Sequence, residues 1–139
     1  MNRGTPRSGC PISIALELIG DAWSLLIVRD LMFKDKQNYN GFLQSEEGIA
    51  SNILADRLRK LEAAGIVDKR VDPADARRFI YRLSAKGIDL APVLVELILW
   101  SARHEVTDAP APVLRAMRSD REAFLAGVRQ RWRASNTAW

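Results

Sequence analysis

The chain has 139 residues, of which 47% are hydrophobic and 27% charged, with a net charge of +4 and a pI near 9.6. These values indicate one globular domain rather than a disordered chain, and the mild basic excess favours an anionic partner. The single cysteine excludes an internal disulfide framework, and the single histidine argues against a zinc site or a histidine-based catalytic triad, so no metal and no cofactor is predicted.

The first residues, "MNRGTPRSG", lead into no long apolar run, so the sequence shows no signal peptide and no membrane span. We therefore expect a soluble cytoplasmic protein without a membrane partner. Residues 1–9 are polar and predict a flexible N-terminal arm.

The N-terminal third of the sequence predicts a series of helices. "CPISIALELIG" has Pro11 at the first helical position and Gly20 at its end, and "DAWSLLIVRDLMF" follows with Asp21 as its N-cap. After the polar turn "KDKQ", the segment "NYNGFLQSEEG" predicts a short helix with Asn40 as its N-cap.

The segment 51–64 has the pattern of an amphipathic helix. At about 100° per residue, Leu54, Leu58 and Leu61 fall on one side, and Gly65 fits the left-handed position after the helix end. The apolar run is too short for a leucine zipper. The polar side chains therefore form a second face that is free to meet a partner.

The next segments predict a β-hairpin and then a long helix. Residues 66–71 and 78–83 alternate with period two around the turn-forming "DPADAR", which places Arg77 and Arg78 at the hairpin tip or its second shoulder. Ser84 is the predicted N-cap of a helix over 85–105, which Pro92 should kink. That helix is apolar on nearly every side, so we expect a partner subunit to cover part of it.

The C-terminal part begins with a stiff break at 108–112, "DAPAP". The segment 119–132 then predicts an amphipathic helix, with Ser119 as N-cap and Glu122 completing a capping box. The domain boundaries expected from the sequence are an arm at 1–9, a core domain at 10–105 and a helical extension at 106–139.

The order of elements predicts a mainly α fold with a small β-hairpin wing, which is the winged helix-turn-helix arrangement. An α-helix fits the major groove of B-DNA, and a basic hairpin can reach the flanking backbone or minor groove. The leucine stripe would hold the helix to the body while its polar face met base edges and phosphates.

The chain resembles the HxlR family of bacterial winged-helix transcriptional regulators. The resemblance is carried by Cys10-Pro11, "ALELIGDAW", "LLIVRDL", "GIASNILADRLRKLEAAGIVDKRV", "YRLSAKG" and "LAPVL…W", over about residues 10–104. It implies a dimeric repressor or activator that contacts DNA through the helix at 51–64 and the wing, with the helix after "SAKG" in the dimer interface. This chain differs in having Ala50 where the family often has serine, which passes the N-cap role to Ser51, and in the acidic Asp72 and Asp75 of its wing tip.

Asparagine can pair with adenine, arginine with guanine, and aspartate with cytosine, which makes the polar face of the 51–64 helix a candidate base reader. Asp56 would repel phosphates, so it should lie over a base or pair with Arg59 or Lys60. The residues predicted to contact DNA are Asn40, Ser51, Asn52, Ala55, Asp56, Arg57, Arg59, Lys60, Arg77 and Arg78. The residues predicted for the dimer interface, at N-terminal and C-terminal helices, are Ile14, Leu90, Leu94, Leu97, Ile98 and Trp100.

Cys10 has two interpretations. It lies at the N-terminus of the first helix, where the helix dipole favours a thiolate, and the resemblance implies that the matching cysteine senses oxidants or electrophiles in several relatives. Alternatively, it is a small residue that helps to seat that helix. A sensor with one cysteine can form only an intersubunit disulfide, a mixed disulfide or an adduct.

The sequence thus predicts a homodimeric, sequence-specific regulator, chiefly a repressor, whose partners are double-stranded DNA, a second copy of itself and an oxidant or small-molecule effector. A winged-helix module that binds protein without productive DNA contact is the main alternative. An enzyme is not expected, because Cys10 has no base within its motif and His104 is far away in the sequence.

Overall fold

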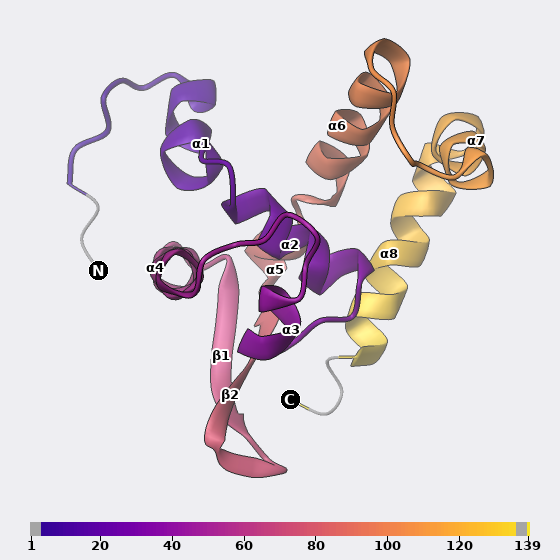
Figure 1. Cartoon of the computed structure of the whole chain (residues 1–139). Helices are drawn as coiled ribbons and strands as arrows, with labels where there is room; N and C mark the ends of the chain where they lie inside the picture. The colour runs from indigo at the N-terminus through magenta and orange to yellow at the C-terminus, as the bar shows by residue number, and fades with distance from the viewer. Residues whose placement is uncertain (1–3, 136–138) are drawn as a thin grey trace. The chain divides into compact units, whose positions relative to one another are not determined.

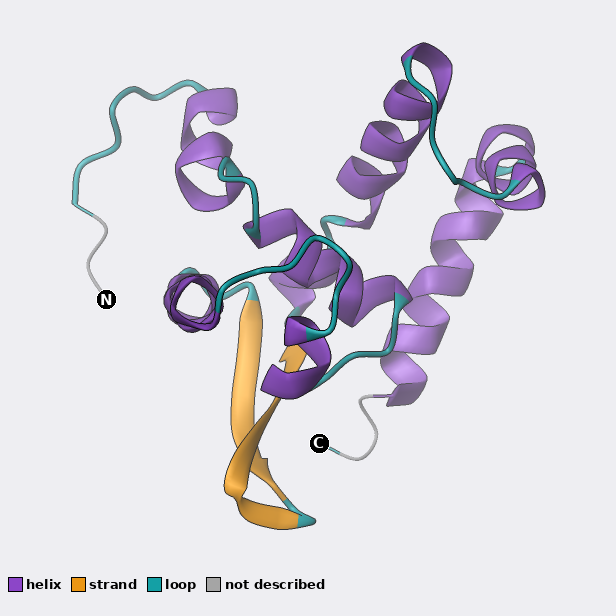
Figure 2. Ribbon diagram, viewed as in Figure 1, coloured by secondary structure: helices purple, strands orange, loops and turns teal. Residues whose placement is uncertain are grey.

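The computed structural model describes residues 4–135 and 139, and the described chain is mostly helical with one antiparallel hairpin (Figures 1 and 2). It forms two compact units, one up to Gly87 and one from Ile88. The elements of the first unit are α1 (Pro11–Ile19), α2 (Ser24–Phe33), α3 (Tyr39–Leu43), α4 (Ser51–Ala63), β1 (Val67–Asp72) and β2 (Asp75–Leu83). The remaining elements are α5 (Ala85–Ile88), which spans the boundary, α6 (Ala91–His104), α7 (Ala111–Ser119) and α8 (Arg121–Ser135).

The first helices are present as predicted, but two caps differ. Asp21 accepts hydrogen bonds from the backbone N–H groups of Trp23 (3.3 Å) and Ser24 (3.2 Å), although α2 itself begins later than predicted and has Trp23 at the N-cap position. The prediction of Asn40 as the cap of α3 is wrong. Asn38 has the extended backbone of an N-cap and accepts from the Gly41 N–H at 2.8 Å, which leaves Asn40 exposed within the helix.

Helix α4 packs its leucine stripe into the core, as predicted. The exposed fractions of Leu54, Leu58 and Leu61 are 0%, 3% and 1%. Gly65 has a φ of 74°, and the N–H groups of Gly65 and Ile66 donate to the carbonyls of Glu62 and Leu61, which completes a Schellman ending.

The N-terminal end of α4 differs from the prediction. Ala50 occupies the N-cap position without a side-chain cap, and Ser51 is the first helical residue rather than a cap. The first N–H groups of α4 therefore receive no capping hydrogen bond from the side chain of Ala50.

The wing is a two-stranded antiparallel hairpin that extends from the body. Val67 pairs with Leu83 at its base and Val71 with Phe79 further out, and the register then shifts so that Asp72 pairs with Asp75. Residues 76–78 fall between the regular pairs, so Arg77 and Arg78 lie near the start of β2, which is the second shoulder of the hairpin, and not at its tip. At the base, Tyr81 donates its N–H to the Gln37 carbonyl at 2.8 Å, which ties β2 to the segment before α3.

The predicted long helix over 85–105 is two helices. Ser84 does cap the first, because its Oγ accepts from the Gly87 N–H at 3.1 Å. Pro92 lies in the first turn of α6, where proline is favoured, so it starts a helix instead of kinking one.

The C-terminal unit has its own small core. Val95, Leu99 and Met117 form a buried cluster, against which Ile98, Leu114, Phe124 and Leu125 pack. Helix α7 was not predicted, and it ends at Ser119. Asp120, not Ser119, caps α8 by accepting from the Ala123 N–H at 3.0 Å.

No single helix among residues 4–135 is long and apolar enough to span a bilayer. Helices α1 and α2 together have the length and composition for it, but they are bent by 79° at their junction.

We predict that Leu58→Ala lowers the free energy of unfolding by about 2–5 kcal/mol, because it leaves a cavity beneath α4. The adjacent Arg59→Ala, on the exposed face, should change it by less than about 1 kcal/mol. Urea unfolding followed by circular dichroism measures both, and equal losses would contradict the inward orientation of the stripe.

Candidate nucleic-acid interface

The outward face of α4 carries most of the residues predicted to contact DNA. Asn52 is exposed, and the side chains of Arg59 and Lys60 are 71% and 59% exposed. Ala55 and Asp56 are partly buried between them. The leucine stripe on the opposite side holds this face outward, so α4 presents a polar surface with two accessible cations.

Asp56 lies at the centre of a charge cluster on this surface. Its carboxylate accepts from Arg59 Nη2 at 3.1 Å and pairs with Lys60 Nζ at 3.2 Å, and Arg57 Nη1 contacts it as well. The hydrogen bond from Lys60, assisted by Arg59 and the charge of Arg57, holds the pKa of Asp56 below its usual value. Asp56 therefore stays ionised, and its neighbours offset its repulsion of phosphate.

Arg57 has a different environment from the other cations of α4. Only 23% of its side chain is exposed, and its Nε donates to Asp21 Oδ2 at 2.7 Å. The Asp21 carboxylate raises the pKa of Arg57. Partial burial would raise the pKa of Asp21, but hydrogen bonds from Ser24, Arg57 and the backbone bring it below the usual value. Arg57 thus fastens α4 to the junction of α1 and α2.

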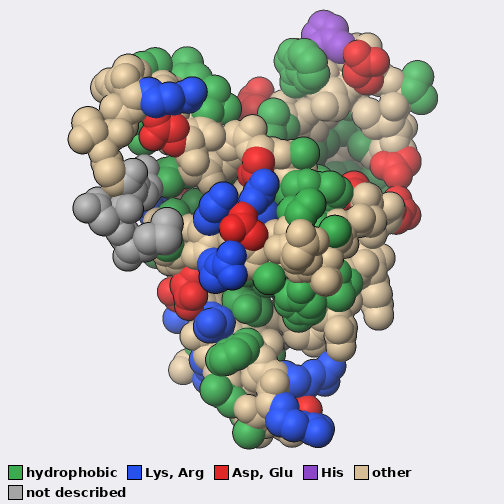
Figure 3. All heavy atoms as spheres, turned by 60° about the vertical axis from the view of Figure 1, so that its left-hand side comes forward, with side chains coloured by type: hydrophobic (Ala, Val, Ile, Leu, Met, Phe, Trp, Pro, Cys, Tyr) green, Lys and Arg blue, Asp and Glu red, His purple; other side chains and the backbone are tan. Residues whose placement is uncertain are grey.

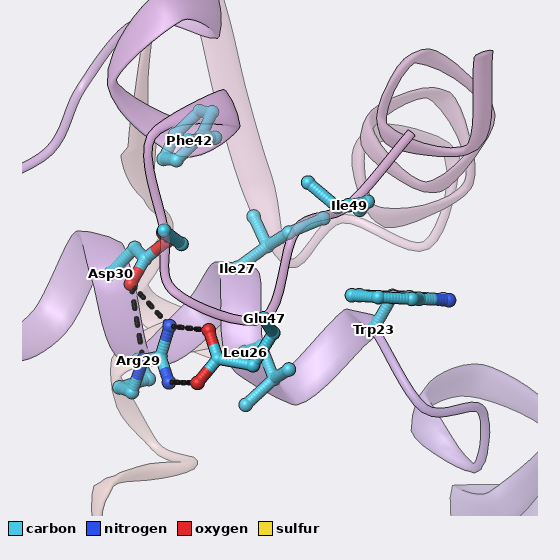
Figure 4. Close-up of a pocket in the computed structure, with 9 residues that line it drawn as sticks. Trp23, Leu26, Ile27, Arg29, Asp30, Phe42, Glu47 and Ile49 are labelled. Atoms are coloured by element: carbon cyan, nitrogen blue, oxygen red, sulfur yellow. Dashed lines mark hydrogen bonds and ion pairs between the residues drawn. The ribbon is translucent and has the colours of Figure 1, made fainter. Parts of the chain in front are cut away.

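A second charged cluster fixes the turn before α4, and the sequence analysis missed it (Figure 4). Asp30, only 2% exposed, accepts from Arg29 Nε at 3.0 Å and from Ser45 Oγ at 2.5 Å. Arg29 also holds both oxygens of Glu47, at 2.7 and 2.9 Å. The charged pair "RD" inside the apolar run "LLIVRDLMF" was the only signal for this cluster.

These hydrogen bonds shift the ionisation of the cluster. The bidentate contact with Arg29 lowers the pKa of Glu47 from 4.5 to about 2. The hydrogen bonds from Arg29 to Glu47, together with its contact with Asp30, raise the pKa of Arg29 above its usual value. Residues 45–47 are therefore held against α2, on one side of a small apolar pocket that contains Leu26, Ile27 and Phe42.

The wing and α3 enclose a second part of the interface. Asn40 lies with Arg77 and Arg78 around a depression of about 270 Å³, whose other lining residues are Asn38, Tyr39, Phe79 and Tyr81. Tyr39 Oη donates to the Ser51 carbonyl at 2.5 Å, which connects α3 to the start of α4. In Figure 3, Lys and Arg side chains gather in one group near the centre of the view and again along the wing at the bottom.

The two wing arginines, Arg77 and Arg78, lie in different surroundings. Arg77 pairs with Asp75, its Nε lying 3.2 Å from Oδ1, and this contact lowers the pKa of Asp75. Arg78 is exposed in the irregular part of β2. The structure thus brings Asn40 together with the wing arginines, and Tyr39 and Asn38 are additional lining residues that the sequence analysis did not select.

The other predicted site residues lie away from α4 and the wing. Cys10 is an exposed free thiol at the N-cap position of α1, and its side chain makes no capping hydrogen bond. Leu97 and Trp100 of α6 are 45% and 57% exposed, whereas Leu94 is already buried in the single chain. Three further residues of the predicted dimer interface, all partly buried, are Ile14, Leu90 and Ile98.

Comparison with known protein families gives one match over most of the chain. The HxlR-like helix-turn-helix family matches residues 18–108. An HTH-type transcriptional regulator from Synechocystis is 35% identical over 88 residues, which are 63% of this chain and 64% of that protein. This chain thus spans less than two thirds of the length of that relative, and 57% of the length of the mycobacterial regulators that also match.

Solved structures show the same similarity. The crystal structure of PA1607 matches with a TM-score of 0.67 and 35% identity, over 76% of this chain and 72% of that one. The reduced form of the transcriptional regulator YodB from Bacillus subtilis matches with a TM-score of 0.57 and 31% identity, over 70% and 95% of the two chains. YodB has also been solved after diamide treatment and with a bound quinone.

The Arg29–Glu47 contact predicts a pH-dependent stability. Because the pKa of Glu47 is depressed by folding, its contribution is complete above about pH 4.5 and is lost as the pH falls toward 2. Since Glu47 is partly exposed, we expect Glu47→Gln to cost only about 1 kcal/mol at pH 7 and less at pH 3.

Urea unfolding of the wild type and the variant at the two pH values measures this difference. Glu46→Gln, at the exposed neighbouring glutamate, is the matched control and should cost less than Glu47→Gln at pH 7. A Glu47→Gln effect that is the same at both pH values would contradict the assignment.

Proposed function

The chain belongs to the HxlR-like helix-turn-helix family of transcriptional regulators, and we propose that it is a homodimeric repressor that binds a pseudo-palindromic operator. In this proposal α4 enters the major groove, and the wing contacts the flanking backbone. The effector is an oxidant or electrophile that reacts at Cys10.

The observation that carries the DNA-binding proposal is the orientation of α4. Its leucine stripe is buried, while Asn52 and Arg59 on the opposite side are exposed. An exposed Asn and Arg on one helix face can pair with adenine and guanine in the major groove. The neighbouring Lys60 can neutralise phosphate charge, which gives affinity without sequence preference.

The proposal of a dimer rests on exposed apolar side chains. Val93, Leu97 and Trp100 recur along one side of α6 and are 41%, 45% and 57% exposed. In α1, Ile12 and Leu16 are 70% and 55% exposed. Apolar groups grouped on a helix face are typical of protein interfaces. A two-fold dimer would place two α4 helices about one turn of DNA, roughly 34 Å, apart.

Selection of bound duplexes from a random pool tests this proposal directly. We expect enrichment of inverted repeats whose half-sites are about 10 base pairs apart. The alternative, a winged-helix module that binds only protein, predicts no enrichment at all. Enrichment of a single unrepeated half-site would contradict the dimeric mode of binding.

Two arginines should contribute to operator binding in different ways. Arg59→Ala should cost about 1–3 kcal/mol and relax the preference at one base position. Arg78→Ala should weaken binding to all sequences alike and flatten the salt dependence by about one unit of slope. Titrations of the selected operator and a scrambled duplex over a range of salt concentrations measure both effects. Unchanged base preference in Arg59→Ala would make the assignment of the reading face wrong.

The proposal for Cys10 rests on its exposure at the start of α1 and on the quinone-bound form of the relative YodB. A quinone would react by addition, in which the thiol sulfur bonds to a ring carbon and the ring becomes a hydroquinone thioether after taking up the thiol proton. This reaction needs no further oxidant. The bulky adduct would lie on α1, beside the apolar side chains assigned to the dimer.

We predict that benzoquinone weakens operator binding by the wild type and leaves Cys10→Ser unaffected. Mass spectrometry should find one adduct per wild-type chain, at Cys10. Because the chain has no other cysteine, equal loss of binding in the serine variant would place the reaction at a different kind of residue and contradict the proposal.

A further inference from the structure

The outer part of the wing carries an exposed apolar pair that the proposed base and phosphate contacts do not use. Val71 and Phe79 are 49% and 46% exposed, although both are large hydrophobic residues. They are partners in the strand register, so their side chains project from the same face of the hairpin. They form the last regular pair before the register shifts toward the tip.

The face of the hairpin that carries Val71 and Phe79 is covered by the body only near the base of the wing. Nearer the body, Val67 and Leu83 are 1% and 2% exposed, and Tyr81 is 8% exposed. The apolar alternation that anchors the base of the wing thus continues one step beyond the point where the body can cover it. Burial of the base does not require apolar residues further out. Val71 and Phe79 are therefore available for a contact with a partner outside the chain.

Three cations lie near the apolar pair, and Arg77, Arg78 and Phe79 line the same depression. Lys69 Nζ lies 4.4 Å from the centre of the Phe79 ring, and Arg77 and Arg78 precede Phe79 in β2. Figure 3 shows hydrophobic side chains exposed along the wing with Lys and Arg side chains beside them. Asp75 is held by Arg77 and by the local backbone, so its carboxylate is engaged within the turn. An exposed apolar pair flanked by positive charge complements nucleic acid better than an apolar protein surface.

We propose that Val71 and Phe79 form an apolar wedge that enters the minor groove beside the operator and partly unstacks one base step. This inference rests on the proposed DNA-binding function and assigns to the wing a part in specificity. Apolar side chains inserted in this way kink the duplex, and flexible pyrimidine–purine steps are the easiest to open. The flanking cations would contact the two phosphate backbones that border the minor groove on either side of the wedge.

The selected operator, in a duplex with a fluorescent dye at each end, tests the wedge. We expect the wild type to shorten the distance between the dyes, which measures a bend, and Phe79→Ala to bend the duplex less and bind about tenfold more weakly. The salt dependence should stay unchanged, since no phosphate contact is removed. Phe79→Leu keeps an apolar side chain and should retain most of the bend and affinity.

In a second experiment, the pyrimidine–purine step that flanks the operator is replaced by a stiff A-tract. This change should weaken the wild type and have little effect on Phe79→Ala. Equal bending and affinity of the wild type and Phe79→Ala would overturn the wedge, as would a flank change that weakens both equally. Failure of the wild type to bind any selected duplex would instead overturn the proposed function, so the two failures are distinguishable. Because Phe79 is half exposed, circular dichroism should show both variants folded.

Discussion

The turn that leads into α4 is tied to the buried carboxyl group of Asp30. A carboxyl group removed from water is costly unless it is paired and hydrogen-bonded, and Arg29 and Ser45 meet both requirements here. Ser45 belongs to the turn between α3 and α4, and Arg29 reaches Glu47 in the same turn. Arg29 pairs with Asp30 within α2, and the Ser45 hydroxyl adds its hydrogen bond only when this turn is in place. Burial of Asp30 thus favours the placement of the turn that leads into α4, while the leucine stripe determines which way α4 faces.

The polar face of α4 is arranged before any partner arrives. Asp56 links Arg59 and Lys60 on one helix face, which limits the freedom of two long side chains that would otherwise have to be ordered on binding. The same carboxylate competes with phosphate for these cations. A base that donates to Asp56 would release them toward the backbone, whereas a base without a donor would leave them paired. In the proposed complex with DNA, Asp56 would therefore couple base recognition to phosphate contact.

The sequence predicted those features that depend on local spacing. The burial of Leu54, Leu58 and Leu61 follows from the helical period, and the left-handed Gly65 follows from the absence of a side chain. The N-cap of α3 was placed at Asn40 instead of Asn38 because both residues are asparagines and the choice depends on backbone angles. The contact of Asp30 with Ser45 could not be predicted, since Ser45 is distant in sequence and only the fold brings it close. The same reason applies to Asn40 and the wing arginines, which meet around a depression formed by separate elements.

The C-terminal helices account for part of the apolar surface of α6, which the sequence assigned to a partner subunit. Helices α7 and α8 both lie wholly beyond the family match, which ends at residue 108. Within the second unit they cover the side of α6 that carries Val95 and Leu99, and Glu96 and Asp89 pair with Arg121 and Arg129 of α8. The side with Val93, Leu97 and Trp100 stays exposed. In the proposed dimer, a partner subunit would therefore cover one side of α6 rather than all of it, which restricts the ways in which two copies could pair.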